Sequence, residues 1–76
     1  MPTIKIIDFI KNDIYSREHP PPHFHALFAE SEELIEIESL QTYIGQIPKP
    51  QRKKVVDWAR DNQDHLLGIF KQLNPR

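Results

Sequence analysis

The chain has 76 residues, no cysteine, and a formal net charge of -1 from 10 Lys and Arg against 11 Asp and Glu. The lack of cysteine excludes disulfides and Cys-ligated zinc, and the balanced charge gives no electrostatic reason to expect nucleic acid. The core of so small a domain rarely supplies more than about 3–5 kcal/mol of net stability. We therefore expect one domain over residues 1–76 that relies on good packing, an oligomer, a partner protein, or a metal held by His and carboxylates.

The chain begins with Met1-Pro2-Thr3-Ile4 and shows no basic-then-apolar leader, and no apolar run approaches about 18 residues. We expect a cytoplasmic protein without a membrane span. Acidic and basic residues are unevenly distributed, and we interpret both groups as solvated faces, with contact to a charged partner as the alternative. The acidic group is Glu30, Glu32, Glu33, Glu36 and Glu38, and the basic group is Lys49, Arg52, Lys53 and Lys54.

Two short strands are predicted at the start of the chain. Residues 3–7 (Thr-Ile-Lys-Ile-Ile) are rich in β-branched side chains and are bounded by Pro2 and Asp8. Residues 13–16 (Asp-Ile-Tyr-Ser) predict a second strand, and Asn12-Asp13 is the favoured place for the turn between them.

Three consecutive prolines, Pro20 to Pro22, lie between His19 and His23. Proline fixes φ at about -65° and restricts the residue before it, so the segment is predicted to be an extended polyproline II arm. If the arm is straight, it separates His19 from His23 by about 12 Å. A closer approach of the two histidines needs a cis proline or a bend.

Residues 23–29 and 34–38 predict a third and a fourth strand. If Ser31-Glu32 is a two-residue loop, Phe28 pairs with Ile35 and Ala26 with Ile37. A three-residue loop instead mixes polar and apolar groups on both faces. We favour the first register because it separates the faces. The apolar face then carries Phe24, Ala26, Phe28, Ile35 and Ile37, and an open polar face carries His23, His25, Glu36 and Glu38.

The rest of the chain predicts an edge strand followed by a helix. Residues 41–47 favour a short edge strand that ends at Gly45. From Pro48 onward the apolar residues recur with helical spacing, as a helix that covers a sheet requires: Val55, Trp58, Ala59, Leu66, Ile69, Phe70 and Leu73. We favour one helix over residues 49–73, kinked near Asn62; the alternative is a second helix from Gln63 capped by Asn62.

These elements predict an α+β fold, a small antiparallel sheet of three to five strands packed on one face by a C-terminal helix. Trp58 is expected to be the largest contributor to the core between them.

His23 and His25 alternate on a predicted strand, which places both imidazoles on one side, about 6–7 Å apart. Several metal sites in β-sheets present two ligands in this way, and His19 or Glu38 could supply the third. A metal site with His23 and His25 as ligands is therefore one hypothesis. A structural interpretation stays open beside it, in which the histidines only hydrogen-bond to the backbone or to Glu38.

A second chemical hypothesis needs no metal. Cleavage of RNA through its 2′-hydroxyl requires a general base, a general acid and a cation for the phosphate, and imidazole can serve both proton roles near neutral pH. Arg17, His19, His23 and His25, together with Tyr15, form such a set of catalytic candidates.

The segments around Ile14–His19, Pro21-Pro22-His23-Phe24-His25-Ala26, Ile35–Glu38 and Val55–Ala59 resemble the bacterial family called domain of unknown function 4160. The resemblance spans nearly the whole chain, and its motif positions are His19, Pro21, Pro22, His23, Phe24 and His25. It implies a compact bacterial protein, often encoded beside another small protein in gene pairs proposed as toxin–antitoxin modules, and it implies no known reaction. The chain departs from the usual pattern at Phe9 and Ala29, where glycine is expected, which places the turn geometries in question.

Our leading functional hypothesis is a component of a toxin–antitoxin-like, two-protein module that acts through a protein partner from the neighbouring gene, or as a homo-oligomer. One alternative is an enzyme, either a His-based RNase or a metal-dependent hydrolase. The other is a DNA-binding autoregulator that uses the basic start of the helix. The sequence identifies no cofactor.

Overall fold

The computed structural model describes residues 3–75, and within them five strands precede two helices. The strands form one antiparallel sheet in chain order, so each strand pairs with the next. This confirms the α+β class and an antiparallel sheet of up to five strands. The strands are β1 (Thr3–Ile7), β2 (Ile10–Asp13), β3 (His23–Phe28), β4 (Ser31–Glu36) and β5 (Thr42–Gly45), and the helices are α1 (Lys49–Arg60) and α2 (Gln63–Leu73).

The first hairpin turns four residues earlier than predicted, at Asp8 and Phe9 instead of Asn12 and Asp13. The strand at Thr3–Ile7 is confirmed, but its partner runs from Ile10 to Asp13, and Ile7 lies opposite Ile10. The turn therefore consists of Asp8 and Phe9, whose φ angles are 46° and 67°. Two residues at positive φ are typical of the tight hairpin turn whose twist matches that of the strands. The expected turn at Asn12-Asp13 is wrong because both residues pair within the sheet.

The second hairpin has a different loop and a different register from the favoured one. Ala29 and Glu30 form the turn, and Ile35 lies opposite Phe24 instead of Phe28. The shift is an even number of residues, so every side chain keeps its predicted face. Phe24, Ala26, Ile35 and Ile37 are accordingly buried.

The sheet ends at β5, which confirms the edge strand closed by Gly45. Gly45 has a φ of 81°, and a Cβ atom there would collide with the Glu32 carbonyl oxygen. That carbonyl accepts a hydrogen bond from the Gln46 backbone N–H at 3.0 Å. Glycine is therefore required where the chain leaves the sheet.

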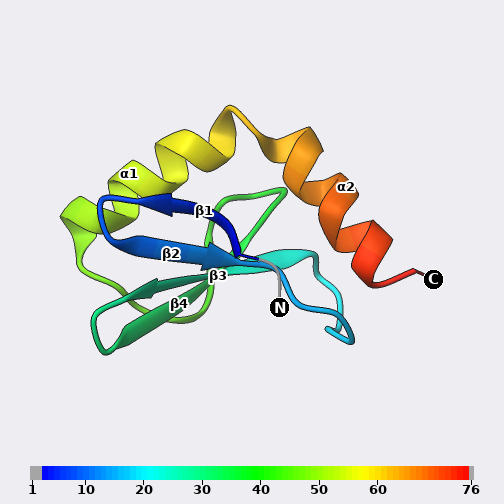
Figure 1. The fold of residues 1–76 in the computed structure, drawn as a ribbon, viewed down its shortest axis with the longest axis horizontal. Coiled ribbons are helices and arrows are strands. Elements are labelled where there is room, and N and C mark those ends of the chain that lie inside the picture. The colour runs from blue at the N-terminus through cyan, green and yellow to red at the C-terminus, as the bar shows by residue number, and fades with distance from the viewer. Residues whose placement is uncertain (1–2, 76) are drawn as a thin grey trace.

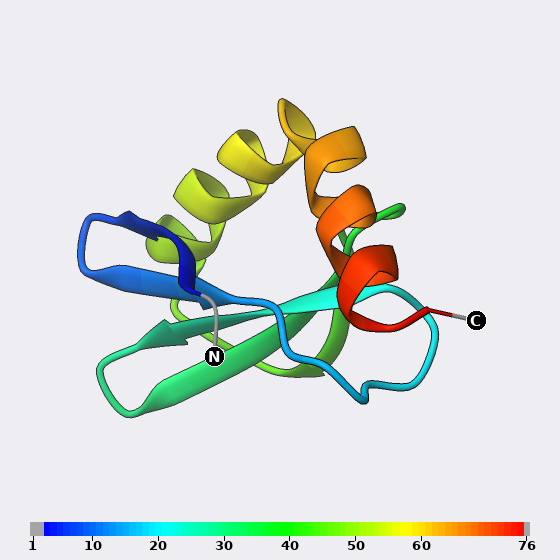
Figure 2. The ribbon, with the colours of Figure 1, turned by 45° about the vertical axis from the view of Figure 1, so that its right-hand side comes forward.

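The C-terminal region forms two helices, so the single helix favoured from the sequence is wrong and the second alternative holds. The break lies at Asp61 and Asn62. The Asn62 side chain does not cap α2 but donates to the Trp58 carbonyl oxygen at 2.8 Å, at the end of α1. Both helices lie on one side of the sheet and meet at an angle above it (Figures 1 and 2).

The core lies between the sheet and these helices. Trp58 is only partly buried and packs edge-to-face on Phe24 with ring centroids 6.1 Å apart, so it borders the core and does not dominate it. The buried residues are Ile10, Ile14, Phe24, Ala26, Ile35, Ile37, Ile47, Val55, Ala59, Leu66 and Phe70.

Glu33 corrects the expectation that the acidic segment is solvated. Its side chain is fully buried on the apolar face, opposite Ala26. The carboxylate accepts hydrogen bonds from Arg52 Nε at 2.8 Å and from the Ile47 backbone N–H at 3.1 Å, and a third from the Thr42 hydroxyl. Because a buried carboxylate needs such partners, Glu33 joins β4 to β5 and to the first turn of α1.

Among the described helices, none has the length and apolar character needed to cross a membrane.

Candidate metal centre

The segment from Ile14 to Pro22 connects β2 to β3 and covers the polar face that the sequence left open. Tyr15 packs edge-to-face on His25, with ring centroids 4.5 Å apart. His23 is only 3% exposed, and the side chain of His25 is only 12% exposed. The predicted open face is therefore wrong at these two positions.

The proline segment bends, and the predicted straight polyproline II arm is wrong. The Pro20–Pro21 peptide bond is cis, and residues 20 and 21 form a bend. The carbonyl oxygens of Pro21 and Pro22 both form hydrogen bonds. The Pro21 oxygen pairs with His23 Nδ1 at 2.8 Å, and the Pro22 oxygen accepts the Ile37 backbone N–H at 2.9 Å.

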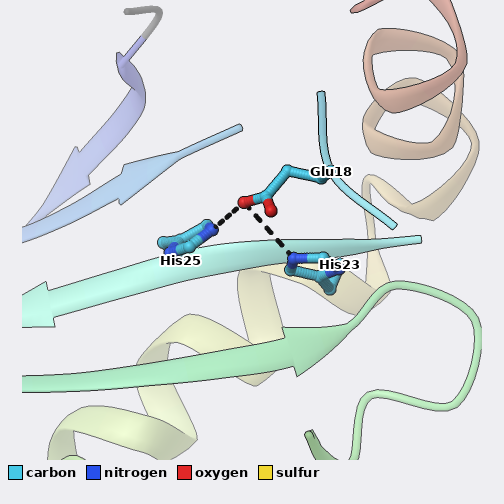
Figure 3. Close-up of side chains that lie close together, drawn as sticks. All are labelled: Glu18, His23 and His25. Atoms are coloured by element: carbon cyan, nitrogen blue, oxygen red, sulfur yellow. Dashed lines mark hydrogen bonds and ion pairs between the residues drawn. The ribbon is translucent and has the colours of Figure 1, made fainter. Parts of the chain in front are cut away.

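Three potential ligand atoms converge between this segment and β3 (Figure 3). His23 and His25 lie two residues apart on a strand, so both rings project to the same face. The Glu18 carboxylate faces both rings: its Oε1 lies 2.6 Å from His25 Nε2 and 3.5 Å from His23 Nε2. Glu18 is 26% exposed at its side chain, which leaves the group accessible from one side.

The hydrogen bonds around His23 leave one nitrogen without a donor or acceptor partner. The Pro21 carbonyl can only accept, so Nδ1 carries a hydrogen, and in a neutral ring Nε2 is then a bare lone pair. This nitrogen is buried and has no hydrogen-bond partner among the described residues. Its lone pair lies 3.5 Å from the Glu18 Oε1 oxygen, an arrangement that a cation between them, either a proton or a metal ion, would stabilise.

His25 faces carboxylates on both sides. Its Nδ1 lies 2.8 Å from Glu32 Oε2, and its Nε2 contacts Glu18. Without a metal, this geometry is satisfied by an imidazolium that donates to both carboxylates. With a metal at Nε2, the Nδ1–H still donates to Glu32. Such a bond to a carboxylate or carbonyl is the usual outer contact that orients a metal-bound histidine, and His23 has the equivalent bond to Pro21.

The residue types fit a transition-metal ion, and the three potential ligand atoms lie within 4.8 Å of one another. Zinc bonds of about 2.0–2.1 Å in a tetrahedral site place ligand atoms roughly 3.3 Å apart. The distance of 3.5 Å between His23 Nε2 and Glu18 Oε1 already matches this value. The 2.6 Å contact between His25 and Glu18 is a direct hydrogen bond. It has to open when an ion enters, which a rotation of the partly exposed Glu18 side chain allows.

A comparison with known proteins identifies the family. The family model "Domain of unknown function (DUF4160)" matches residues 10–70. The chain belongs to this family. The resemblance inferred from the His-Phe-His motif is therefore confirmed, and the matched range contains Glu18, His23 and His25. No match to a curated protein or to a solved structure was found.

The other predicted site residues of this DUF4160 chain lie outside the cluster. Arg17 and His19 are exposed and, together with Glu18, line a hollow of about 370 Å³ that also includes Leu73, Asn74 and Pro75. Arg17 and His19 are not members of the ligand group that the described residues form. Glu38 was expected as a third metal ligand or as a hydrogen-bond partner of the histidines. It is exposed, it is not in the ligand group, and it makes no hydrogen bond to His23 or His25 among the described residues. Of the five residues considered for a metal-free RNase, the structure therefore brings together only Tyr15, His23 and His25.

Glu18 is the candidate ligand that the sequence did not indicate. It precedes His23 by five residues and His25 by seven, and neither spacing is diagnostic in an irregular segment. Its position depends on the bend at the prolines and on Arg17, whose φ is 62°. The available signal was its place inside the family motif region, directly before His19.

The basic run of α1 is largely solvated, as expected: Lys49, Lys53 and Lys54 are exposed, and Arg52 is half-buried. Lys53 pairs with Asp57 at 2.7 Å, Lys54 pairs with Asp8 at 2.7 Å, and Arg52 pairs with Glu33. Because these cations already contact carboxylates of the same chain, the basic start of the helix gives little support to a DNA-binding function.

Proposed function

We propose that this DUF4160 protein is a metal-dependent hydrolase whose divalent ion is held by Glu18, His23 and His25. The observation that supports this proposal most strongly is the convergence of two imidazole nitrogens on one carboxylate oxygen, with His23 Nε2 buried and unpartnered among the described residues. Two histidines and one carboxylate form a recurrent ligand set of catalytic zinc sites, and this set leaves coordination positions for water and substrate.

Hydrolysis at this site would combine the Lewis acidity of a bound ion with the positioning of its ligands by the protein. A bound divalent ion lowers the pKa of a coordinated water to about 7 and polarises a carbonyl or phosphoryl oxygen. The protein fixes the two imidazoles through Pro21 and Glu32, and it leaves the Glu18 side of the site accessible. Burial of the histidines keeps water from the opposite side, and this would strengthen the electrostatic effect of a bound ion on its remaining ligands.

The proposal is tested by metal binding and hydrolysis in matched variants. Glu18→Gln and His25→Ala each remove one ligand, whereas His65→Ala removes the exposed histidine of α2, outside the cluster. We expect the ligand variants to lose at least about 100-fold in Zn²⁺ affinity, more than loss of an outer contact typically costs. They should also lose metal-dependent hydrolysis of a chromogenic phosphodiester or ester, while His65→Ala keeps both.

Circular dichroism of each variant verifies that the fold is retained. The proposal is contradicted if the wild-type chain binds none of Zn²⁺, Mn²⁺, Co²⁺ and Fe²⁺, or if His25→Ala binds Zn²⁺ as tightly as the wild type. Binding with no hydrolysis but with Fe²⁺-dependent oxygen consumption would redirect the assignment to an oxygenase, because that class uses the same ligand set.

A second candidate function is the partner-binding role in a two-protein, toxin–antitoxin-like module. It is favoured by apolar side chains exposed at both edges of the sheet: Ile6 and Phe9 at β1, and Tyr43 and Ile44 on β5. Exposed apolar edge strands are templates for strand addition by another protein. We expect the neighbouring gene product to co-purify with the chain and Ile44→Lys to weaken that complex. A complex unaffected by Ile44→Lys and by Ile6→Lys contradicts binding through the sheet edges.

A further inference from the structure

We propose that Asn74 is the positioning residue that holds Glu18 in place for the metal site. This inference rests on the proposed function of Glu18, His23 and His25. Glu18 lies in a segment without regular secondary structure, so no helix or strand fixes its carboxylate. A ligand on such a segment needs another contact to keep its geometry.

The side-chain amide of Asn74 supplies this contact across most of the chain. Its oxygen accepts a hydrogen bond from the Glu18 backbone N–H at 2.6 Å. Its nitrogen donates to the Tyr15 carbonyl oxygen at 3.0 Å and to the Phe70 carbonyl oxygen at 3.0 Å. One amide therefore ties both ends of the turn at Ser16 and Arg17 to the C-terminus of α2.

The turn that Asn74 spans is the one that aims Glu18 at the histidines. Arg17 has a φ of 62°, in the left-handed region that residues other than glycine rarely adopt. Hydrogen bonds on both sides of Arg17 hold this conformation. The Arg17 side chain is exposed, while the Glu18 carboxylate reaches His25 Nε2 on β3.

The same turn of α2 also supports the first histidine. The Phe70 ring is buried with its centroid 5.6 Å from that of His23. The Asn74 backbone N–H in turn donates to the Phe70 carbonyl at 2.8 Å. The last turn of α2 thus contacts both the candidate carboxylate ligand Glu18 and the candidate imidazole ligand His23. Glu18 and Asn74 are 56 positions apart in the sequence.

The test compares Asn74→Ala with Asn62→Ala. Asn62 is a matched control, because its amide also donates to the carbonyl four residues earlier at a helix C-terminus but contacts no part of residues 14–22 in the described hydrogen bonds. We expect Asn74→Ala to lower the Zn²⁺ affinity about 10- to 100-fold, as loss of an outer contact to a ligand typically does. Asn62→Ala should leave the affinity unchanged.

A metal-free measurement separates this proposal from the proposed function. The imidazole ¹⁵N chemical shifts of His25 report whether Nε2 still bonds to Glu18 in the absence of any ion. We expect Asn74→Ala to change the Nε2 shift and Asn62→Ala to leave it as in the wild type. Asn74→Asp, which keeps an oxygen to accept the Glu18 N–H, should fall between the wild type and Asn74→Ala and serves if Asn74→Ala does not fold.

The outcomes are distinct. If the wild type binds no metal but the His25 shift depends on Asn74, the proposed function fails and the positioning role stands. If Asn74→Ala and Asn74→Asp match Asn62→Ala in the His25 shift and in the Zn²⁺ affinity, the positioning role is overturned, whatever the function of the site.

Discussion

Tyr15 shows at the scale of one residue how the segment over β3 is held. Its hydroxyl donates to Asp13 Oδ2 at 2.8 Å, and its ring packs on His25. Burial, then the hydrogen bond to Asp13 and the charges of Asp13, Glu32 and Glu18, raise the pKa of Tyr15 to about 12 from its ordinary value of 10.0. The phenol therefore stays neutral beside the candidate ligands.

This raised pKa predicts a specific loss of stability in alkali. Between pH 10.0 and about 12, the unfolded chain loses the Tyr15 proton while the folded chain keeps it. The free energy of unfolding must then fall as pH rises through this window, and it is unaffected below it. In urea denaturation, the stability of the wild type relative to Tyr15→Phe should be constant below pH 10.0 and decline above it. If the stability difference between the wild type and Tyr15→Phe stays constant up to pH 12, the raised pKa of Tyr15 is contradicted.

Single residues also show what the sequence could predict about the site. The strand period of two places His23 and His25 on one side of the strand. A register shift by an even number of residues leaves both on the same face of the sheet. Glu18 could not be predicted, because its approach depends on the dihedral angles of Arg17 and on contacts to Asn74, which is 56 positions away in the sequence. The burial of Glu33 could not be predicted for a similar reason, since its half-buried partner Arg52 comes from another element.

At the scale of elements, the two hairpins owe their registers to turns that lack glycine. Phe9 and Ala29 are the two positions at which the family pattern predicts glycine, and both have positive φ, 67° and 54°. Phe9 is also 90% exposed, so its side chain adds no packing to offset the unfavourable backbone. Periodicity predicts four of the five strands and the faces of β3 and β4. The strand predicted at residues 13–16 is wrong, because β2 runs from Ile10 to Asp13. The turns are not predicted, because these residues do not carry the usual signal for them.

Ala29→Gly is accordingly expected to stabilise the protein. Glycine removes the cost of holding a residue with a Cβ atom in the left-handed conformation, which is roughly 1–2 kcal/mol. The greater conformational freedom of glycine in the unfolded chain offsets roughly 0.5–1 kcal/mol of this gain. We expect a net gain of roughly 0.5–1 kcal/mol in the free energy of unfolding, measured by urea denaturation. Ala59→Gly makes the same change inside α1 and should destabilise instead. Equal losses in both variants contradict the assigned turn.

The helix break is a second element that periodicity could not resolve. The apolar residues of α1 and α2 keep one phase, which favoured a single helix. Asn62 ends that helix because its amide bonds back to the Trp58 carbonyl, and the backbone N–H groups of Asp61 and Asn62 bond to Trp58 and Ala59. The two shorter helices can then each lie over a different part of the sheet.

At the scale of the whole molecule, the candidate site joins the two ends of the domain. Residues 14–22 supply Glu18, β3 supplies both histidines, and the last turn of α2 contacts this set through Asn74 and Phe70. A chain of 76 residues without cysteine has few means of adding stability beyond its core. A metal ion at this junction would stabilise the fold as well as supply chemistry.

The most direct test of the account is calorimetric titration of the metal-free protein with Zn²⁺, repeated in buffers of different ionisation enthalpy and paired with thermal unfolding. We expect a single ion to bind, with a binding enthalpy corrected for any protons exchanged with the buffer. Zn²⁺ at about 100 times its dissociation constant should then stabilise the fold by about 2.7 kcal/mol. The stabilisation should be lost in His25→Ala and kept in His65→Ala. An absence of binding heat, or a Zn²⁺ response that is the same in His25→Ala, contradicts a metal centre at Glu18, His23 and His25.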